Sequence, residues 1–180
     1  MDGDVYNELA LLIESSPQEV WSGLLPIFDV NDPLEEHYID NLLQPRSDDN
    51  LAAGLLYKFP ADVYLAWVRE NPKERAERVV QWLPIAIKQK DNALSWHPEL
   101  ISYVNEFGMY SSVLSEIAVR FSPSAWWGSI VPHLEPWLPR LREWLQHPLP
   151  EVRNWAQQQI DFLEKQIIVA RKRDIEGSVR

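Results

Sequence analysis

Apolar residues recur along most of this chain at the three-and-four spacing of an α-helix, and prolines interrupt the pattern at regular intervals. Fourteen prolines stand against six glycines, and several Xaa-Pro steps fall where one apolar stripe ends and the next begins. Proline is tolerated in the first turn of a helix and breaks its interior, so these steps mark helix boundaries. Two stripes near the C-terminus show the pattern most clearly: Leu134, Trp137, Leu138, Leu141, Trp144 and Leu145, followed by Val152, Trp155, Ala156, Ile160, Leu163 and Ile167.

This spacing predicts an all-α fold, because no alternating apolar segment bounded by hairpin turns stands out. The connections are short, and we therefore expect consecutive helices to pack as antiparallel hairpins. The polar segment 44–50 is interpreted as a surface loop. The predicted helices span residues 4–14, 17–28, 33–43, 50–58, 61–70, 73–88, 98–107, 110–121, 133–146 and 150–173.

The C-terminal hairpin matches earlier parts of the chain when the sequence is shifted by a constant interval. One shift places Trp155 on Ile117, and a second shift of the same size places it on Val79 (155 − 117 = 117 − 79 = 38). An approximate period near 38 with two helices per unit is typical of an α-solenoid. We expect each hairpin to bury its apolar face against its neighbours, with tryptophans such as Trp137, Trp144 and Trp155 in the core.

The residues around the last inter-helix turn match a known repeat. The segment 147–160 resembles the turn and second helix of a HEAT repeat, and the matching residues are Pro150, Glu151, Val152, Arg153 and Ala156. His147 stands where the family often has Asp. The resemblance implies a right-handed α-solenoid of about four HEAT-like antiparallel hairpins, and a structural role for Arg153. The segment 126–155 is also similar to the terminal HEAT-like segment of large bacterial multi-domain proteins, some linked to phage defence.

The length of 180 residues fits one domain. We interpret residues 1–180 as a single HEAT-like repeat domain, with an acidic, divergent part (1–60), repeats (61–170) and a charged tail expected to fray (171–180). No apolar run approaches the roughly 20 residues that span a bilayer, and Met1-Asp2-Gly3-Asp4 does not resemble a secretory signal. The chain has no cysteine. We therefore expect a cytoplasmic protein without membrane contact.

The net charge of −10 lies in the first third of the chain. Residues 1–60 hold two cations and twelve anions (2 − 12 = −10), whereas residues 61–120 sum to −1 and residues 121–180 to +1. Nucleic-acid binding depends on cations that displace counterions, so direct binding to nucleic acid is not expected. An acidic region favours a protein partner with a basic surface, although surplus carboxylates also serve solubility alone.

The motifs that carry chemistry are absent from the sequence. It contains no HExxH, no GxSxG, no P-loop and no GxGxxG. Three of the four histidines (His97, His133 and His147) adjoin a proline, which places them at helix ends, capping carbonyls or facing solvent. We therefore expect no enzyme, no cofactor, no metal and no small-molecule substrate.

These observations favour a non-enzymatic protein-interaction or scaffold module. The resemblance to the bacterial proteins implies that this module is a subunit of a bacterial defence or regulatory complex, or a separately made C-terminal product. One alternative is an acidic immunity or antitoxin-type protein that neutralises a basic, nucleic-acid-acting partner by charge mimicry. Another is nucleic-acid binding by late basic residues such as Arg140 and Arg142.

Trp126 and Trp127 are the candidate aromatic anchors for the partner, since tryptophan is enriched in interface hot spots. The alternative interpretation is structural: one of these rings fills a gap between repeat units, and the other lies on the surface. The candidate acidic contacts are Asp29, Asp32, Glu35, Glu36, Asp40, Asp48 and Asp49.

Overall fold

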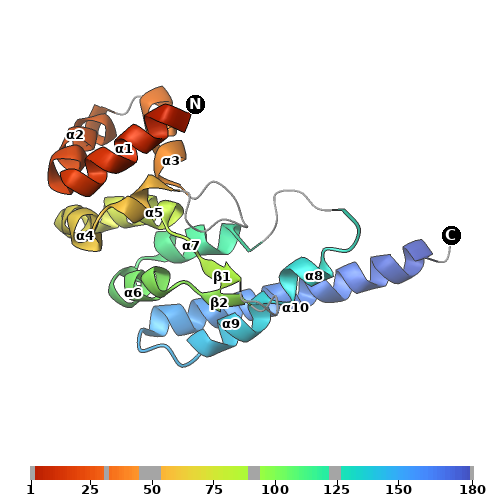
Figure 1. Cartoon of the computed structure of the whole chain (residues 1–180). Coiled ribbons are helices and arrows are strands. Elements are labelled where there is room, and N and C mark those ends of the chain that lie inside the picture. Colours follow the sequence, from red (N-terminus) through yellow and green to blue (C-terminus); the bar gives the residue numbers. More distant parts are fainter. Residues whose placement is uncertain (1–2, 31–32, 45–53, 89–93, 122–126, 179–180) are drawn as a thin grey trace. The chain divides into compact units, whose positions relative to one another are not determined.

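The computed structural model describes residues 3–30, 33–44, 54–88, 94–121 and 127–178, and most of them are helical (Figure 1). The coarse prediction of a helical protein is therefore confirmed. The helices are α1 (Gly3–Ser15), α2 (Pro17–Val30), α3 (Pro33–Leu43), α4 (Ala61–Glu70), α5 (Pro72–Trp82), α6 (Pro98–Phe107), α7 (Ser111–Val119), α8 (Val131–Leu134), α9 (Trp137–Trp144) and α10 (Pro150–Ser178). A 3₁₀ turn, η1 (Leu55–Lys58), and two short strands, β1 (Ala86–Lys88) and β2 (Leu94–Trp96), complete the described elements.

The chain divides into two compact units, Met1–Pro84 and Ile85–Arg180, which we call unit 1 and unit 2. The boundary falls inside the segment 61–170 that the sequence assigns to continuous repeats. The single repeat domain over residues 1–180 remains a prediction. Each unit is described separately below.

Prolines begin the helices where the sequence places them. The first residues of α2, α3, α5, α6 and α10 are Pro17, Pro33, Pro72, Pro98 and Pro150. In this position proline loses no intrahelical hydrogen bond and its fixed φ suits the helix. Pro136 has a further effect, because the predicted helix 133–146 is divided there into α8 and α9.

The expectation of a chain without strands is wrong at one place. The predicted helix 73–88 ends at Trp82, and β1 pairs antiparallel with β2 in the register Ala86↔Trp96, Ile87↔Ser95 and Lys88↔Leu94. Pro84 explains the change, because proline disfavours helical geometry in the residue before it. Leu83 is accordingly extended, with φ −80° and ψ 142°.

Three helix pairs recur at nearly constant intervals along the sequence. The first helices of the pairs begin at Ala61, Pro98 and Trp137, at intervals of 98 − 61 = 37 and 137 − 98 = 39. The second helices begin at Pro72, Ser111 and Pro150, and their two intervals are equal (111 − 72 = 150 − 111 = 39).

Unit 1 has an aromatic core centred on Trp21 of α2. Its ring meets Phe59 edge-on at a centroid distance of 5.2 Å and Trp67 of α4 at 5.8 Å. Trp82 of α5 also contacts Trp21, at 6.4 Å. Large aromatic side chains in these arrangements bury much apolar area, which is the main source of folding free energy.

Unit 2 is built around a second aromatic cluster. Trp96 of β2 stacks on Trp144 of α9 with ring centroids 4.1 Å apart and an angle of 12° between the planes. The Trp96 indole N–H donates to the carbonyl oxygen of Arg140 at 3.0 Å. The predicted core positions Trp137, Trp144 and Trp155 are all buried, which confirms their assignment.

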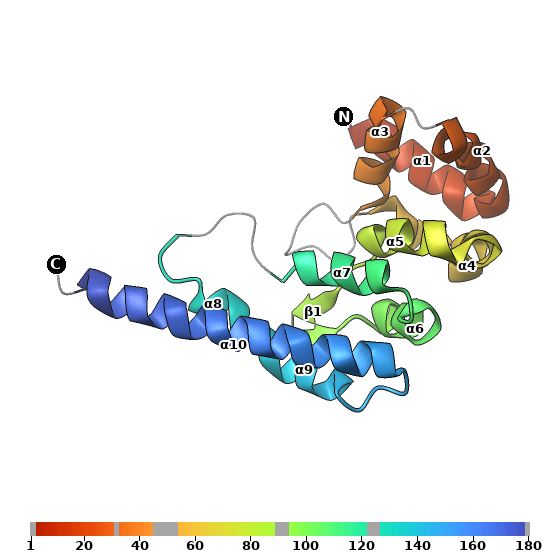
Figure 2. The ribbon, with the colours of Figure 1, turned by 180° about the vertical axis from the view of Figure 1, so that it is seen from behind.

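Helix α10 carries the longest apolar stripe of unit 2. Figure 2 shows it running beside α9 and past α8. The buried residues that form this stripe are Val152, Trp155, Ala156, Ile160, Leu163 and Ile167. They are the residues that the helical spacing places on the core side.

Candidate functional site

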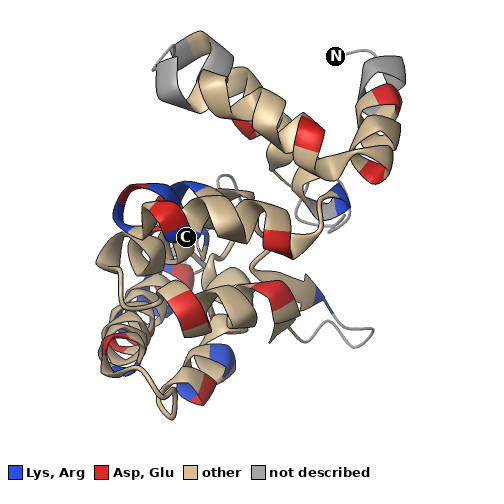
Figure 3. Cartoon of the chain, turned by 90° about the vertical axis from the view of Figure 1, so that its left-hand side faces the viewer, with Lys and Arg blue, Asp and Glu red and all other residues tan. Residues whose placement is uncertain are grey.

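Most of the predicted acidic contacts lie where the structure gives no side chain. Asp29, Glu35 and Glu36 belong to α2 and α3, but their side chains are outside the described residues, as are Asp32, Asp48 and Asp49 altogether. No Lys or Arg precedes Arg46 in the sequence, and in Figure 3 the acidic residues of α1 to α3 stand without basic neighbours on those helices.

Asp40 is the exception, and its carboxylate is engaged inside unit 1. Its Oδ1 accepts a hydrogen bond from Trp82 Nε1 at 3.0 Å and lies 3.5 Å from Arg78 Nη2. The Arg78 guanidinium also lies over the Phe28 ring, 4.4 Å from its centroid. Asp40 thus joins α3 to α5, and its charge is balanced by a cation of its own unit. Its contact with a partner remains a prediction.

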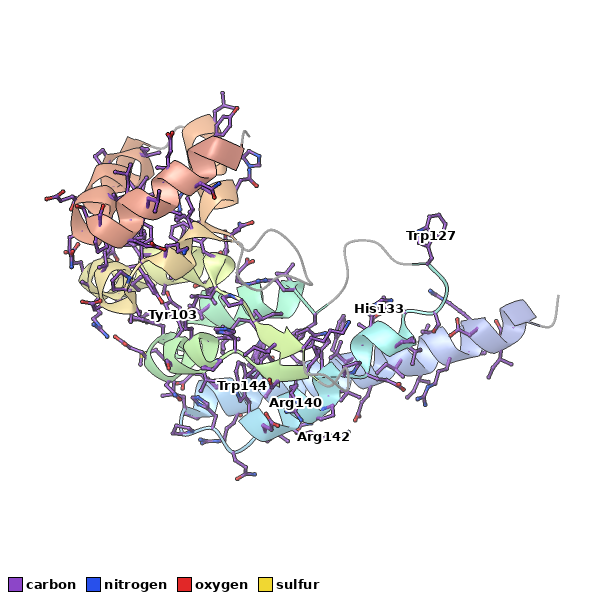
Figure 4. All side chains as sticks on the ribbon, in the orientation of Figure 1. Tyr103, Trp127, His133, Arg140, Arg142 and Trp144 are labelled. Atoms are coloured by element: carbon purple, nitrogen blue, oxygen red, sulfur yellow. The ribbon has the colours of Figure 1, made fainter. Side chains whose placement is uncertain are left out.

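Trp127 is the predicted anchor that the structure places in the open. Its side chain is 98% exposed, and Figure 4 shows it directed away from the helices of unit 2. Trp126 lies outside the described residues.

An ordered turn presents this ring. Gly128 has φ +81°, in the left-handed region that glycine adopts without strain. The Val131 N–H then donates to Ser129 Oγ at 3.2 Å, at the start of α8. Val131 and Leu134 are buried, so α8 fixes the turn to the body of unit 2.

The side of α8 is fastened to α10 by an ion pair. Glu135, which follows α8, binds Arg171 of α10. A second pair joins Arg142 of α9 to Glu164 of α10, with Nη2 and Oε1 3.0 Å apart. Both ion pairs are largely exposed, so we assign them a positioning role and not a large share of the stability.

The sequence interpretation missed a second apolar face on α10. Phe162, Ile168, Val169 and Ile175 are each at least half exposed, although they occur within the same helix as the buried stripe. Their spacing of six, one and six residues was the available signal. It was overlooked because the stronger stripe at positions such as Leu163 and Ile167 already accounts for the core.

His97 and His147 occupy equivalent places, each just before a proline, and neither faces solvent. Both are buried. His97 Nδ1 accepts from the Glu99 N–H at 3.3 Å, and His147 Nδ1 accepts from the Leu149 N–H at 3.2 Å. Burial lowers the pKa of both imidazoles below 6.5, and the positive charge of Arg153 lowers the pKa of His147 further. Both side chains therefore act as neutral helix-start acceptors.

Arg153 ties the turn before α10 together. Its Nη1 donates to the carbonyl oxygens of His147 at 2.7 Å and Pro148 at 2.8 Å. This arginine is thus a structural residue, the role implied by the resemblance to the HEAT turn.

No reactive centre stands out in the described part of the chain. Within it, no group of three or more His, Asp or Glu side chains is placed to hold a metal ion. A cavity of about 30 Å³ in unit 1 is lined by apolar side chains such as Leu9, Ile13 and Phe59. That volume holds a few water molecules at most, which is too small for an organic ligand.

Two further findings concern membrane crossing and the comparison with known proteins. Within the described residues, no helix combines the length and the apolar character that crossing a membrane requires. A comparison with protein-family models, curated proteins and solved structures finds no match for this chain.

Proposed function

We propose that this chain is a protein-interaction module that binds its partner through Trp127. The observation that carries the proposal is the 98% exposure of this ring on a turn that α8 fixes in place. A tryptophan in water gains a large apolar contact area on binding, and tryptophan is over-represented among residues that dominate binding energy.

The ordered backbone beside Trp127 strengthens this argument. A ring on a structured turn loses little conformational freedom when a partner covers it, so more of the contact energy is left for affinity. Gly128 and Ser129 provide that structure on one side of the ring. The other exposed large apolar residues in the described part of unit 2 have smaller side chains than tryptophan, and they are 39–68% exposed.

We further propose that the architecture is a right-handed HEAT-like α-solenoid of about four hairpins. The equal spacing of Pro72, Ser111 and Pro150 supports a repeat of two helices. The bonds that Arg153 makes across the turn support the HEAT resemblance of residues 147–160. The proposed role in a bacterial defence or regulatory complex rests on that resemblance alone, and the cytoplasm is the location that we propose.

The charge distribution supports a partner with a basic surface, because residues 1–60 carry −10. It gives less support to charge mimicry of nucleic acid. Asp40, one of the acids that mimicry would place at the partner, is matched by Arg78 and Trp82 within unit 1. The interaction module is therefore the preferred function.

Site-specific photo-crosslinking tests the proposal. A photoreactive phenylalanine analogue replaces Trp127 in the full chain, which is expressed in its native host and irradiated. We expect one protein to be crosslinked at this position. The matched control carries the same analogue at Met109, an exposed residue on the turn between α6 and α7 of the same unit.

Two results would contradict the proposal. The first is that position 127 yields no crosslinked protein above the level seen at position 109. The second is that W127A binds the purified, crosslinked protein as tightly as the wild type does. A hot-spot tryptophan costs about 2 kcal/mol or more when replaced by alanine, which is roughly a thirtyfold loss of affinity.

A further inference from the structure

Helix α1 packs one side into unit 1 and turns another side toward solvent. Leu9 and Ile13 line the small apolar cavity of unit 1, and Ile13 is buried. Successive residues of a helix are rotated by about 100°, so Leu11 points away from these two side chains. We call the side that carries it the outer face of α1 and define it by the exposed residues Glu8, Leu11, Leu12 and Ser15.

The outer face combines apolar and acidic side chains in the spacing of a packing surface. Leu11 is 66% exposed and Leu12 is 54% exposed. A single exposed leucine is ordinary, but these two are adjacent, and both neighbour Glu8 on the helix surface because they follow it by three and four residues. From position 8 to position 15 the steps are three, one and three residues, which is the spacing of a stripe along which another helix packs.

The charge of unit 1 has one dominant sign. Unit 1 holds six Lys and Arg against sixteen Asp and Glu (6 − 16 = −10), whereas unit 2 is neutral (11 − 11 = 0). Helices α1, α2 and α3 contain no Lys or Arg. Among the described residues, the cation that pairs with an acid of α1 is Lys58 of η1, whose Nζ lies 2.5 Å from Oε1 of Glu14. Glu14 is rotated by about 120° from Glu8 around the helix axis, so this ion pair lies to one side of the outer face.

We propose that the outer face of α1 binds a basic amphipathic helix of the partner protein. The inference rests on the proposed function, to which it adds a second surface, in unit 1, and the chemistry of the segment that fits it. Lys or Arg on the midline of that helix would meet Glu8, and apolar residues beside them would cover Leu11 and Leu12. Amphipathic helices bind through apolar anchors three and four residues apart, which is the spacing of this face.

The sign of the charge argues against two other occupants. A second copy of this chain would bring together two units that each carry −10. An anionic membrane surface would be repelled by the same charge. Opposite charge attracts a basic segment from a distance, and the two leucines favour a segment with an apolar side over one that is only basic.

Designed peptides test the proposal on the full chain. The probe is a fluorescently labelled helical peptide of about 21 residues, three heptads, with lysine along one line of the helix and leucine on both sides of that line. A second peptide contains the same residues in an order that scatters the leucines around the helix, so that it has the same charge and no apolar side. We expect the amphipathic peptide to bind at least tenfold more tightly. If it binds no better than the scattered peptide, charge alone attracts it and the proposal is wrong.

Substitutions in the protein locate the binding surface. E8K should weaken binding of the amphipathic peptide about fivefold, because an attraction becomes a repulsion. The matched control is E77K, since Glu77 is also exposed and is also the sixth residue of its helix, α5, in the same unit. An equal loss with E77K would mean that the general charge of unit 1, and not the outer face, attracts the peptide.

A second variant tests the apolar part of the outer face without changing its charge. L11S should weaken the amphipathic peptide about fivefold, because the exposed leucine is then no longer there to be covered. Circular dichroism and thermal unfolding check that E8K, E77K and L11S keep the wild-type fold. Unchanged affinity of a folded L11S variant refutes the proposal.

Other occupants would also overturn the proposal. One is an anionic membrane, shown by binding of the wild type, but not of L11S, to vesicles of phosphatidylserine and phosphatidylcholine. The other is a second copy, shown by sedimentation of a dimer that L11S dissociates.

Photo-crosslinking separates this inference from the proposed function. A photoreactive analogue at position 11 should crosslink the protein that is captured at position 127, and mass spectrometry of the crosslinked peptide should find a segment rich in Lys or Arg. Crosslinks at 127 without any at 11 leave the proposed function intact and refute the basic-helix surface. An acidic or uncharged segment crosslinked at position 11 refutes it as well.

Discussion

Gly108 lies on the turn between α6 and α7, next to the side chain of Val152 in α10. A Cβ on this residue would lie 2.5 Å from the carbonyl oxygen of Val104 and 2.7 Å from Cγ2 of Val152. G108A should therefore lower the free energy of unfolding by about 1–3 kcal/mol, because the turn must shift away from both the Val104 carbonyl and the Val152 side chain. Urea denaturation measures the change.

Gly23 provides the matched control for that substitution. It lies within α2, and nothing lies within 4 Å of a Cβ built on it. Alanine is the better helix former, so G23A should raise the free energy of unfolding by about 0.5–1 kcal/mol. If the two glycines respond alike, close approach at Gly108 is not the reason for glycine there.

The neutral imidazoles of His97 and His147 make stability depend on pH. Protonation of Nδ1 would remove the acceptor for the Glu99 and Leu149 N–H groups. Because the pKa of each is lowered below 6.5 in the folded state, the unfolded chain binds more protons just below pH 6.5. The contribution of the two histidines to the free energy of unfolding should be constant well above pH 6.5, fall as the pH drops from 6.5 toward the folded-state pKa values, and be constant again below them.

Asparagine in place of both histidines checks this assignment. It can accept the same backbone hydrogen bonds and does not titrate, so H97N/H147N should flatten the decline below pH 6.5 in denaturation curves. Burial raises the pKa of Glu99 above 4.5, and its contribution has the opposite sign, decreasing as the pH rises above 4.5. That part should persist in the variant. A decline as steep as in the wild type would exclude the histidines as its source.

At the scale of elements, α10 divides at the end of its buried stripe. A chain that ends at Ala170 keeps the buried residues Ile160, Leu163 and Ile167. The described ion pair that it loses with the rest of unit 2 is the exposed one between Arg171 and Glu135. Its free energy of unfolding should fall by less than about 1 kcal/mol. A chain that ends at Gln159 loses all three buried residues, each worth about 1.5–3 kcal/mol, and unit 2 should unfold. Thermal unfolding of the two chains distinguishes the cases.

The helices themselves could be predicted largely from apolar spacing and proline. α3 (Pro33–Leu43) and α4 (Ala61–Glu70) have the predicted bounds. The strand pair could not be predicted, because Ile87 continues the apolar stripe of Val79, Val80 and Leu83. Periodicity alone does not distinguish a short strand from the end of a helix. Pro84 was the signal that the helix could not continue. The prediction of a helix over 73–88 gave more weight to the apolar spacing than to this proline.

The candidate site was less predictable, for a physical reason. Sequence can mark Trp127 as unusual, but only coordinates show whether a ring is buried or exposed. The exposed apolar residues of α10, from Phe162 to Ile175, have the spacing of a second stripe, and a sequence does not state which of two stripes faces the core. Asp40 looked like one more surface acid, since its partners Arg78 and Trp82 are distant from it in the sequence.

At the scale of the whole molecule, each unit has an aromatic cluster of its own. W21A removes the centre of the unit 1 cluster and should cost about 3–5 kcal/mol there. Hydrogen exchange should then show faster exchange of protected amides in residues 3–82, with a smaller effect in residues 94–178. W155A should give the reverse pattern, because Trp155 lies 5.6 Å from Trp144 in unit 2. Equal loss of protection in both units, for either variant, would mean that the chain unfolds as one.

The division after Pro84 has no compositional signal. The nearly constant spacing of the helix starts continues across it, from the pair that begins at Ala61 to the pair that begins at Pro98. Sequence self-similarity therefore favoured one uninterrupted array, whereas contacts group the chain in two.

The stacked indoles of Trp96 and Trp144 give this chain a built-in optical reporter. At 4.1 Å their electronic transitions couple, so this pair's contribution to the near-ultraviolet circular dichroism changes whenever the mutual orientation of the two rings changes. Because one ring belongs to β2 and the other to α9, the contribution of this pair is lost when the strand pair leaves that helix, even if every helix stays intact. Docking of the hairpin can thus be followed in real time without attaching a dye.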